Sequence, residues 1–444
     1  MEQKTSRDVL FYWLLFLINY PLLSEVIRRF IYYSDLFFVL GDFLILGTLL
    51  FCYRGAVRAV SLGMTFYLVA VFLLAWGLAS ALNHGNPMIT LVGARAIFVP
   101  FFYIFVSGYF FRRYEDSLKL LVRSVAFWCV VISAVALAQV YLGRENPINA
   151  LPDAIQATGI GDFTVESEGL GLDYMFRPTS IFLHTGKFGQ IIFVLVLFKW
   201  VTLLLYPPAR SRFLVATIPM DLIGIIVSGQ RGTYLFLTLS MLFVYLFYGL
   251  RSPAKVAKSL MLGASLLGLV GSIWFAYVPE GLRELLLARY LSSFKDVFLR
   301  INENLVLPLF DIVHRYGVIG EGMGYFTLGA ARFGGAVLYE TVTTAGVAEN
   351  SWLRLIAEMG LLAAALFAVM LLLLVVRAIR ISSYRRVAAS CQVRAVAVFF
   401  ICWLVSISMW AITHDVFSNS TMMSIGFMLG GPAFLRWHYN SKPG

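Results

Sequence analysis

The chain has 444 residues, of which 60% are hydrophobic and only 13% are charged, and its formal net charge at pH 7 is +11. Soluble domains carry charge on about 25% of their residues, so this composition excludes an ordinary soluble protein. Apolar stretches of about 20 residues, the length that crosses a bilayer as a helix, recur along the whole chain.

We therefore expect an all-α, polytopic membrane protein with about 12 transmembrane helices. The seventh is short and contains Pro219 and Asp221. The first apolar stretch continues into ordinary sequence without a small-residue cleavage site, so we expect no cleaved signal peptide. The expected helices lie near 9–27, 33–53, 60–81, 88–110, 119–142, 186–206, 213–228, 233–250, 256–277, 352–376, 394–413 and 416–435.

The basic residues predict the orientation of these helices. Cytoplasmic loops of membrane proteins carry an excess of Lys and Arg, and the chain follows this rule if both termini are cytoplasmic. The net positive charge is then a signal of topology, and nucleic acid is not an expected partner. The inner loops would hold Arg54, Arg58, Arg112, Arg113, Arg210, Arg212, Arg251, Lys255, Lys258, Arg377, Arg380, Arg385 and Arg386.

This orientation leaves two long loops on the outer side. Residues 1–277 would hold the first nine helices and an outer loop at 143–185, residues 278–351 a large outer loop, and residues 352–444 the last three helices and a cytoplasmic tail. The centre of the first loop, ATGIGDFTVESEGLGLD, is typical of irregular structure. In the second, EGLRELLLARYLSSFKDVFLRINENL has amphipathic helical spacing and GVIGEGMGYF is glycine-rich, which predicts a helical domain lying on the membrane plane.

Motifs for metals and nucleotides do not occur in the sequence. The cysteines lie in or beside the expected spans without a CxxC pattern. There is no Walker loop, no GxGxxG after a strand and no HExxH. We therefore expect neither a metal nor a cofactor, and we do not expect ATP hydrolysis to drive the protein. The cysteines are Cys52, Cys129, Cys391 and Cys402.

Charged residues gather instead on the expected outer side. Arg177 precedes the sixth helix, Arg231 lies in the short turn after the seventh, and Arg95 lies inside the fourth. An arginine within a span costs about 3 kcal/mol even on the mild insertion scale, so Arg95 is either functional or a structural partner of Asp42 or Asp221. Further outer charges are His184, Lys187, Arg283, Arg289, His314, Arg315, His414 and Asp415.

Some of these side chains have structural explanations. Arg283 and Arg289 are equally consistent with snorkelling to lipid headgroups or with pairing to Glu280 and Glu284. The histidines His184 and His414 are consistent with satisfied interfacial positions. Arg177 and Arg231 favour function, because guanidinium groups at helix mouths hold phosphate bidentately. Arginines at the outer ends of helices suit an anionic amphiphile whose diphosphate lies at the level of the lipid headgroups. A carboxylate beside it would complete a glycosyl-transfer site, because the leaving diphosphate must be neutralised and the attacking hydroxyl needs a base.

One segment carries the spacing of a known signature. ENSWL, residues 349–353, is followed by six residues and then by Gly360. These residues, 349–360, which we call the signature segment, resemble the signature of the O-antigen ligase and Wzy-type polymerase superfamily. The ligases have His, then Asn or Ser, two residues, Leu, six residues and Gly, and here Glu349 stands at the position of His.

Other features of that superfamily also have candidates here. An arginine follows the first long outer loop, as Arg177 does, and a second arginine occupies a turn of the SGQRG type, as Arg231 does. A glycine-rich element of the form G-x-G-x-G-Y/F lies upstream of the signature, and it is matched by Gly320, Gly322, Gly324 and Tyr325.

The resemblance implies a GT-C-like glycosyltransferase that takes undecaprenyl-diphosphate-linked oligosaccharide as donor. It implies a site on the periplasmic side of the bacterial inner membrane, without metal or nucleotide. Ligases pass the glycan to lipid A core, and polymerases pass it to another lipid-linked repeat unit. Because Glu349 replaces His, we favour a polysaccharide polymerase, with a chain-length regulator as a further candidate partner. A ligase, and a flippase or transporter of lipid-linked oligosaccharide, are the alternatives.

The resemblance also implies roles for single residues. Glu349 would be the catalytic base; its alternative is an acidic residue stabilised by a helix N-terminus. Independently of the resemblance, the i,i+4 spacing of Arg354 and Glu358 predicts an ion pair or contacts with other buried charges. Asn350 would cap or orient the turn. The candidate substrate-binding residues are Arg177, Arg231, Arg289, Arg315, His314, Asn350 and Arg95.

Overall fold

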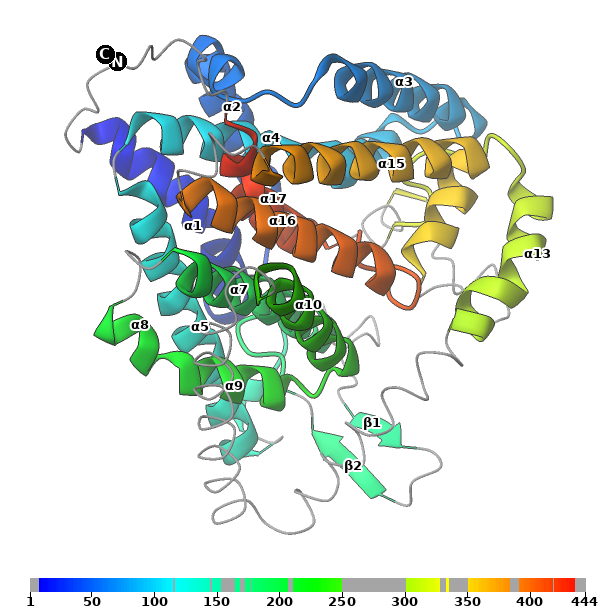
Figure 1. The fold of residues 1–444 in the computed structure, drawn as a ribbon. Helices are drawn as coiled ribbons and strands as arrows, with labels where there is room; N and C mark the ends of the chain where they lie inside the picture. The colour runs from blue at the N-terminus through cyan, green and yellow to red at the C-terminus, as the bar shows by residue number, and fades with distance from the viewer. Residues whose placement is uncertain are drawn as a thin grey trace, which may run out of the picture. The chain divides into compact units, whose positions relative to one another are not determined.

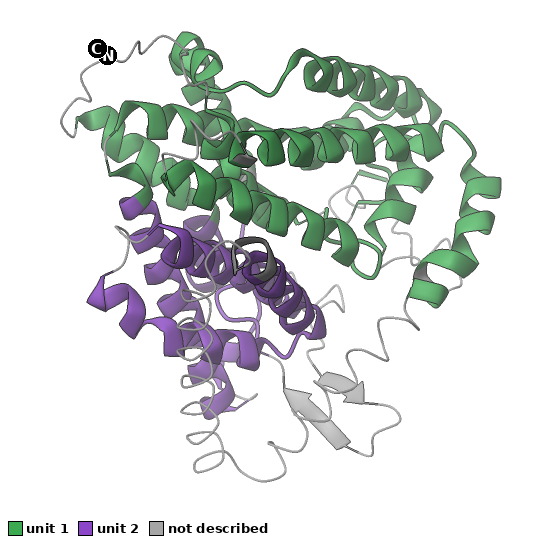
Figure 2. Ribbon diagram, viewed as in Figure 1, with its two compact units in different colours: residues 1–21, 36–118, 297–444 green, residues 22–35, 119–296 purple. Residues whose placement is uncertain are grey.

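The computed structural model describes residues 8–114, 116–143, 146–152, 164–167, 172–176, 178–206, 211–249, 301–327, 333–334, 350–383, 391–417 and 419–435. The chain forms two compact units (Figure 2). Unit 1 consists of Met1–Pro21, Leu36–Leu118 and Val297–Gly444, and unit 2 consists of Leu22–Asp35 and Lys119–Asp296.

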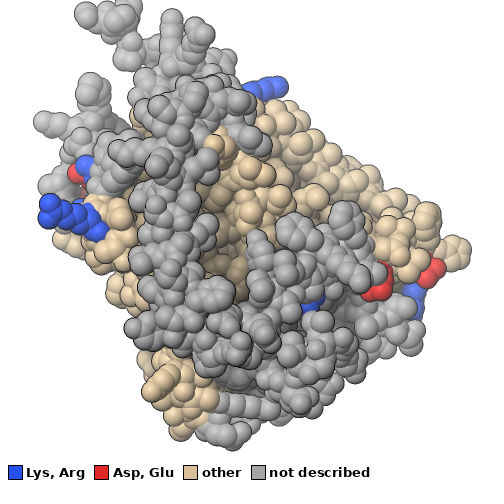
Figure 3. Space-filling model, turned by 60° about the horizontal axis from the view of Figure 1, so that its bottom comes forward, with Lys and Arg blue, Asp and Glu red and all other residues tan. Residues whose placement is uncertain are grey.

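Among the described residues, eight helices are long and apolar enough to cross a membrane. They coincide with the first six, the tenth and the eleventh expected spans, so the prediction of a polytopic helical membrane protein is confirmed. On the face seen in Figure 3, the described surface carries charged side chains at only a few separate points. The helices are α1 (Val9–Phe30), α2 (Leu36–Ala59), α3 (Met64–Ser80), α4 (Pro87–Arg113), α5 (Ser117–Leu142), α7 (Thr185–Leu205), α15 (Ser351–Ser383) and α16 (Cys391–Trp410) (Figure 1).

Three further expected spans are also helical, and two of them are shorter or interrupted. The seventh consists of α8 (Arg212–Ala216) and α9 (Ile218–Ser228), and Pro219 stands in the first turn of α9, where its missing N–H costs nothing. The eighth is α10 (Arg231–Gly249). The twelfth is α17 (Ser420–Gly430), which ends in the 3₁₀ turn Gly431–Phe434. The ninth expected span, residues 256–277, lies outside the described residues.

The core of unit 1 depends on close helix contacts at glycines. In this unit α4 packs against α2 and α17, and α15 packs against α3 and α16. Gly426 and Gly430 of α17 lie directly against Trp403 and Phe400 of α16, where any Cβ would collide with an aromatic ring. Small residues permit such packing in a membrane, where lipid leaves no hydrophobic drive for helix association.

The core of unit 2 surrounds α7, in which residues 188–199 are all buried. The Lys199 ammonium donates to Thr217 Oγ1 at 2.6 Å and to the two Asp221 carboxylate oxygens at 2.9 and 2.7 Å. All three ammonium hydrogens therefore have acceptors, and the buried charge is paired. Asp221 is thus the partner of Lys199, which explains how the short seventh span carries an acidic residue.

The expected first outer loop contains a short hairpin that the sequence analysis did not predict. The strand β1 (Thr164–Ser167) pairs antiparallel with β2 (Leu172–Phe176). The expectation of irregular structure was therefore wrong for these residues. In β2, Leu172, Tyr174 and Phe176 stand at alternate positions, but Met175 between the last two is also apolar. The alternation that indicates a strand was therefore short, and the surrounding glycines and acidic residues outweighed it.

Of the expected large outer loop, residues 301–316 are helical. The π-helical turn Asn302–Val306 leads into α13 (Leu307–Tyr316), which buries Ile312 and Tyr316 and exposes Phe310. A glycine-rich segment, residues 317–327, follows α13 and packs against α15. Residues 278–300 and 335–349 of this loop lie outside the described residues.

Candidate functional site

Three of the candidate site residues lie outside the described residues: Glu349, Arg177 and Arg289. The prediction that Arg177 and Arg231 meet in one cavity therefore stays a prediction. Of the remaining candidates, Arg231 belongs to unit 2, whereas unit 1 holds Asn350, Arg95, His314 and Arg315.

The signature segment forms a short helix of its own within α15. Gly360 has φ 80° and ψ 170°, which breaks α15 into residues 351–359, which we call the signature helix, and a long helix from residue 361 onward. Figure 1 shows the short yellow part of α15 meeting the long orange part at an angle. A Cβ at Gly360 would also collide with the carbonyl of Val318. The last position of the signature therefore requires glycine for two reasons, positive φ and close backbone approach.

The first described residue of the signature caps this helix. The Asn350 side-chain oxygen accepts hydrogen bonds from the backbone N–H groups of Trp352 at 2.9 Å and Leu353 at 3.1 Å. Asn350 is completely buried. Asparagine is among the preferred N-cap residues because its side chain satisfies donors that have no partner inside the helix. The expectation that Asn350 caps this turn is confirmed.

Ser351 joins the signature helix to the turn after α16. Its backbone N–H donates to the Ala411 carbonyl at 2.9 Å. Its hydroxyl oxygen accepts from the N–H groups of Val416 at 2.7 Å and Phe417 at 3.0 Å, and lies 3.0 Å from a carboxylate oxygen of Asp415. The hydroxyl also lies 3.2 Å from the His414 carbonyl oxygen, so one serine side chain contacts four consecutive positions, 414–417, of the expected outer turn.

Three charged side chains, two of them buried, lie together at the first two turns of the signature helix. Arg354 is 5% exposed and forms an ion pair with Asp415, and its Nε lies 3.7 Å from a carboxylate oxygen of Glu358. Glu358 is 1% exposed. The prediction of an Arg354–Glu358 ion pair is confirmed. One cation here lies between two anions, so removing Arg354 would leave two carboxylates without it.

The glycine-rich segment caps the other end of the signature helix. Because Gly360 ends that helix, its last carbonyls need partners from elsewhere. Glu321 N–H donates to the Ala357 carbonyl at 2.9 Å, and Gly322 N–H donates to the Glu358 carbonyl at 2.7 Å. Gly324 N–H reaches the Glu358 side chain at 3.3 Å.

Glycine is needed at several of these positions. Gly320, Gly322 and Gly324 all have positive φ, and a Cβ at Gly320 would lie 2.6 Å from the Glu358 carbonyl oxygen. The two elements of the resemblance, the glycine-rich one and the signature, are therefore in direct contact within unit 1.

The other candidate residues of unit 1 lie in an ion pair or on the protein surface. Arg95 forms an ion pair with Asp42, which is one of its two expected structural partners, and both side chains are partly buried. His314 and Arg315 lie in the last turn of α13 and are exposed. The Arg315 guanidinium lies 5.4 Å from the centre of the Tyr316 ring. Their proposed contacts with glycan or phosphate stay predictions.

In unit 2, Arg231 is the first residue of α10, in a turn that is fixed against α7. Gly229 has φ 57° and ends α9 in the left-handed conformation. The Thr233 hydroxyl then donates to the Gly189 carbonyl at 2.9 Å, and a Cβ on Gly189 would collide with Gln230. The SGQRG turn and the first turns of α7 therefore form one packed element.

Sequence reasoning missed a group of charges at the end of α1 in unit 2. Glu25, Arg28 and Arg29 are nearly completely buried there. Arg28 contacts Asp35 at 2.7 Å, and Glu25 lies 3.6 Å from the Lys187 ammonium. Two adjacent arginines at the expected outer end of a span run against the positive-inside rule, and that signal could have identified them.

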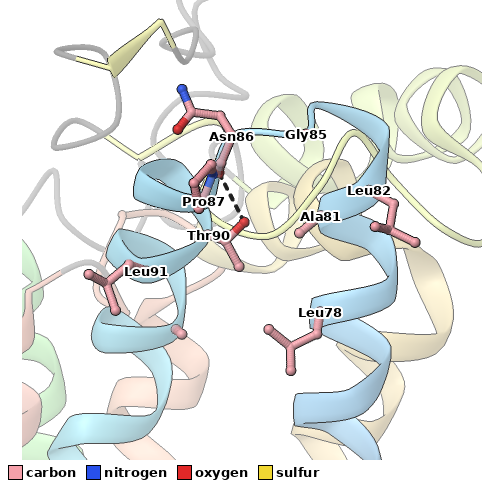
Figure 4. Close-up of a pocket in the computed structure, with 9 residues that line it drawn as sticks. Leu78, Ala81, Leu82, Gly85, Asn86, Pro87, Thr90 and Leu91 are labelled. Carbon is pink, nitrogen blue, oxygen red and sulfur yellow. Dashed lines mark hydrogen bonds between the residues drawn. The ribbon is translucent and has the colours of Figure 1, made fainter.

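A groove lies on unit 1 between the ends of α3 and α4 (Figure 4). Its volume is ≈ 370 Å³, and Leu78, Leu82 and Leu91 are among the residues that line it. At its upper rim in this view, the Thr90 hydroxyl donates to the Asn86 carbonyl at 3.1 Å. By the expected orientation this end of α3 and α4 is the outer one, so the groove would offer apolar surface just below the headgroups.

The described residues contain no group of three or more His, Cys, Asp or Glu side chains that could hold a metal ion. No protein-family model matches the sequence, and no curated protein matches it.

Proposed function

We propose that this protein is a membrane glycosyltransferase of the GT-C type and that it acts as a polysaccharide polymerase. It would transfer glycan from an undecaprenyl-diphosphate carrier to a lipid-linked repeat unit. The proposal places it in the bacterial inner membrane, with about twelve helices, both termini in the cytoplasm and the site on the periplasmic side.

The observation that carries this proposal is the structural role of two fixed positions of the signature segment. Asn350 caps the signature helix and Gly360 ends it. Ser351, at a variable position between them, binds the turn after α16. The glycine-rich element completes the same unit by capping the far end of the helix. A chance match of spacing would not be expected to place asparagine and glycine where the backbone needs a cap and a positive φ.

The proposed reaction is a displacement at the anomeric carbon of the donor sugar. Glu349, directly before Asn350, would accept the proton of an acceptor hydroxyl as its oxygen forms the new glycosidic bond. The bond from the anomeric carbon to the diphosphate oxygen breaks, and the diphosphate leaves with the electron pair. Arg177 and Arg231 would neutralise that leaving group. Further contacts to diphosphate or glycan are proposed for Arg95, His314, Arg289 and Arg315, whereas buried Asn350 would act through the cap of the signature helix.

Reconstitution tests this proposal directly. The purified full chain is placed in liposomes with a fluorescent oligosaccharide linked to undecaprenyl diphosphate, and products are separated by size. Chain lengthening supports the polymerase. Transfer that occurs only when lipid A core is supplied would make the protein a ligase. Movement of the oligosaccharide across the bilayer without new glycosidic bonds would make it a flippase and overturn the proposal.

A further inference from the structure

We propose that Asp415 is a positioning residue for glycosyl transfer, which acts by fixing the N-terminal end of the signature helix. The inference rests on the proposed function, because it concerns how Glu349 is held in place. Asp415 lies in the expected outer turn after α16, far from Glu349 in sequence, and none of the motifs includes it.

Asp415 contacts the signature helix through two different side chains. One carboxylate oxygen lies 3.0 Å from the Ser351 hydroxyl, and the other forms the ion pair with Arg354. Ser351 is only two residues after Glu349, and Arg354 stands one turn further along the helix. The two contacts therefore fix both the position and the rotation of the helix end that follows Glu349 in the sequence.

This helix needs such outside contacts. It spans residues 351–359, because Gly360 breaks α15. Helices shorter than about 12–15 residues are marginal by themselves in water, and here the break prevents the long part of α15 from setting its direction. Its far end is held by the glycine-rich segment and by Trp76, whose indole N–H donates to the Met359 carbonyl at 3.0 Å. Its near end is held by the turn that contains Asp415.

The Arg354 side chain makes the role of Asp415 electrostatic as well as geometric. Arg354 is buried between Asp415 and Glu358, and its contact with Glu358 is the longer one, at 3.7 Å. Without the Asp415 charge, Arg354 would turn toward Glu358 alone, and the hydroxyl of Ser351 would lose its charged neighbour. Displacement of a catalytic group by about 1 Å can lower a rate about 100-fold.

The variant Asp415→Asn tests this inference, because it keeps an oxygen near Ser351 and removes the charge that faces Arg354. In the liposome assay we expect kcat to fall by up to about 100-fold. We expect KM for the lipid-linked donor to stay within about twofold, since the proposed phosphate contacts are other residues. Asp8→Asn is the matched control: it removes the Asp8–Arg113 ion pair of the same unit, at 3.1 Å, on the expected inner side.

Combining Asp415→Asn with Glu349→Gln separates positioning from general stability. If Asp415 acts through Glu349, the substitution Asp415→Asn should slow the Glu349→Gln protein by no more than about twofold, because the effects of the two substitutions on the rate are then not independent. Equal slowing in both backgrounds, or an unchanged kcat for Asp415→Asn alone, would overturn the inference. If the Asp415→Asn protein does not fold, Asp415→Glu replaces it in the same double-mutant comparison, and the same outcomes apply. A wild-type protein that forms no glycosidic bond would instead overturn the proposed function, and this inference with it.

Discussion

Each unit holds a cluster of buried charge, and the two clusters differ in balance and exposure. In unit 2, one cation, Lys199, faces one anion, Asp221, and both side chains have no exposed surface. In unit 1, Arg354 lies between Glu358 and Asp415, and the Asp415 side chain is 24% exposed. The first cluster is neutral and closed. The second carries an extra negative charge and reaches the surface beside the signature segment, which is where we expect chemistry.

The largest expected effect concerns the residue next to the open cluster. Glu349→Gln should lower the rate of glycosyl transfer by about 10²–10⁴-fold, because an amide cannot accept the hydroxyl proton. The fold and the binding of lipid-linked donor should be retained, and both are measured on the same purified protein. Glu349→Asp should keep part of the activity, and Glu349→His tests whether the ligase residue can replace it. A Glu349→Gln protein that lengthens chains at the wild-type rate would leave this glutamate as a helix-end charge.

The closed cluster should affect stability and not catalysis. Lys199→Met leaves Asp221 buried without its cation, which should destabilise the protein by about 3–5 kcal/mol. Thermal unfolding in detergent measures this loss. The double variant with Asp221→Leu should recover most of it, since an apolar pair of similar volume replaces the ion pair. A lower transfer rate per folded molecule in that double variant would mean that the closed cluster is also functional.

Arg231, at the expected outer end of the unit with the closed cluster, should affect activity. Arg231→Ala should lose about 10- to 100-fold, since a hydrogen bond to a charged group contributes about 1.5–3 kcal/mol. Arg231→Lys should recover only part, because the ammonium lacks the planar fork. Transfer is compared at equal protein amounts with Arg212→Ala, an exposed arginine at the expected inner end of unit 2. Full activity of Arg231→Ala would contradict a role in binding diphosphate.

The smallest expected effect distinguishes two helix caps. Asn350→Ala removes the cap of the signature helix, and Asn419→Ala removes the cap of α17, where the side-chain oxygen accepts from Met422 N–H at 3.1 Å. Each should lower the free energy of unfolding by about 1 kcal/mol. Only Asn350→Ala should also lower the transfer rate, because only that cap adjoins Glu349. Equal activity of both variants would show that the cap is purely structural.

The sequence predicted the membrane spans well because twenty-residue apolar windows are a strong local signal. It predicted the Arg354–Glu358 pair from i,i+4 spacing, and it offered Asp42 as one of two partners for Arg95. These successes depend on features that are close in sequence or on a small number of buried charges. The hairpin at residues 164–176 was missed because acidic residues and glycines outweighed a short alternation.

The part of the candidate site that the sequence did not predict depends on contacts between distant segments. Nothing local indicates that Ser351 and Arg354 meet Asp415, or that Gly322 caps the signature helix through the Glu358 carbonyl. The break at Gly360 was also not predicted, because an isolated glycine inside an apolar helical pattern is often tolerated. Only its positive φ and the nearby Val318 carbonyl show why glycine stands there.

The break at Gly360 also explains how charges can stand at the start of so apolar a helix. The whole of α15 has 33 residues, which at 1.5 Å per residue is roughly 50 Å, whereas the hydrocarbon layer is about 30 Å thick. Residues 361–383 alone provide roughly 35 Å and can cross that layer without help. The nine helical residues before Gly360 are therefore not needed to span the hydrocarbon layer. Arg354 and Glu358 can thus lie in the headgroup zone, outside the hydrocarbon in which insertion of an arginine would be costly.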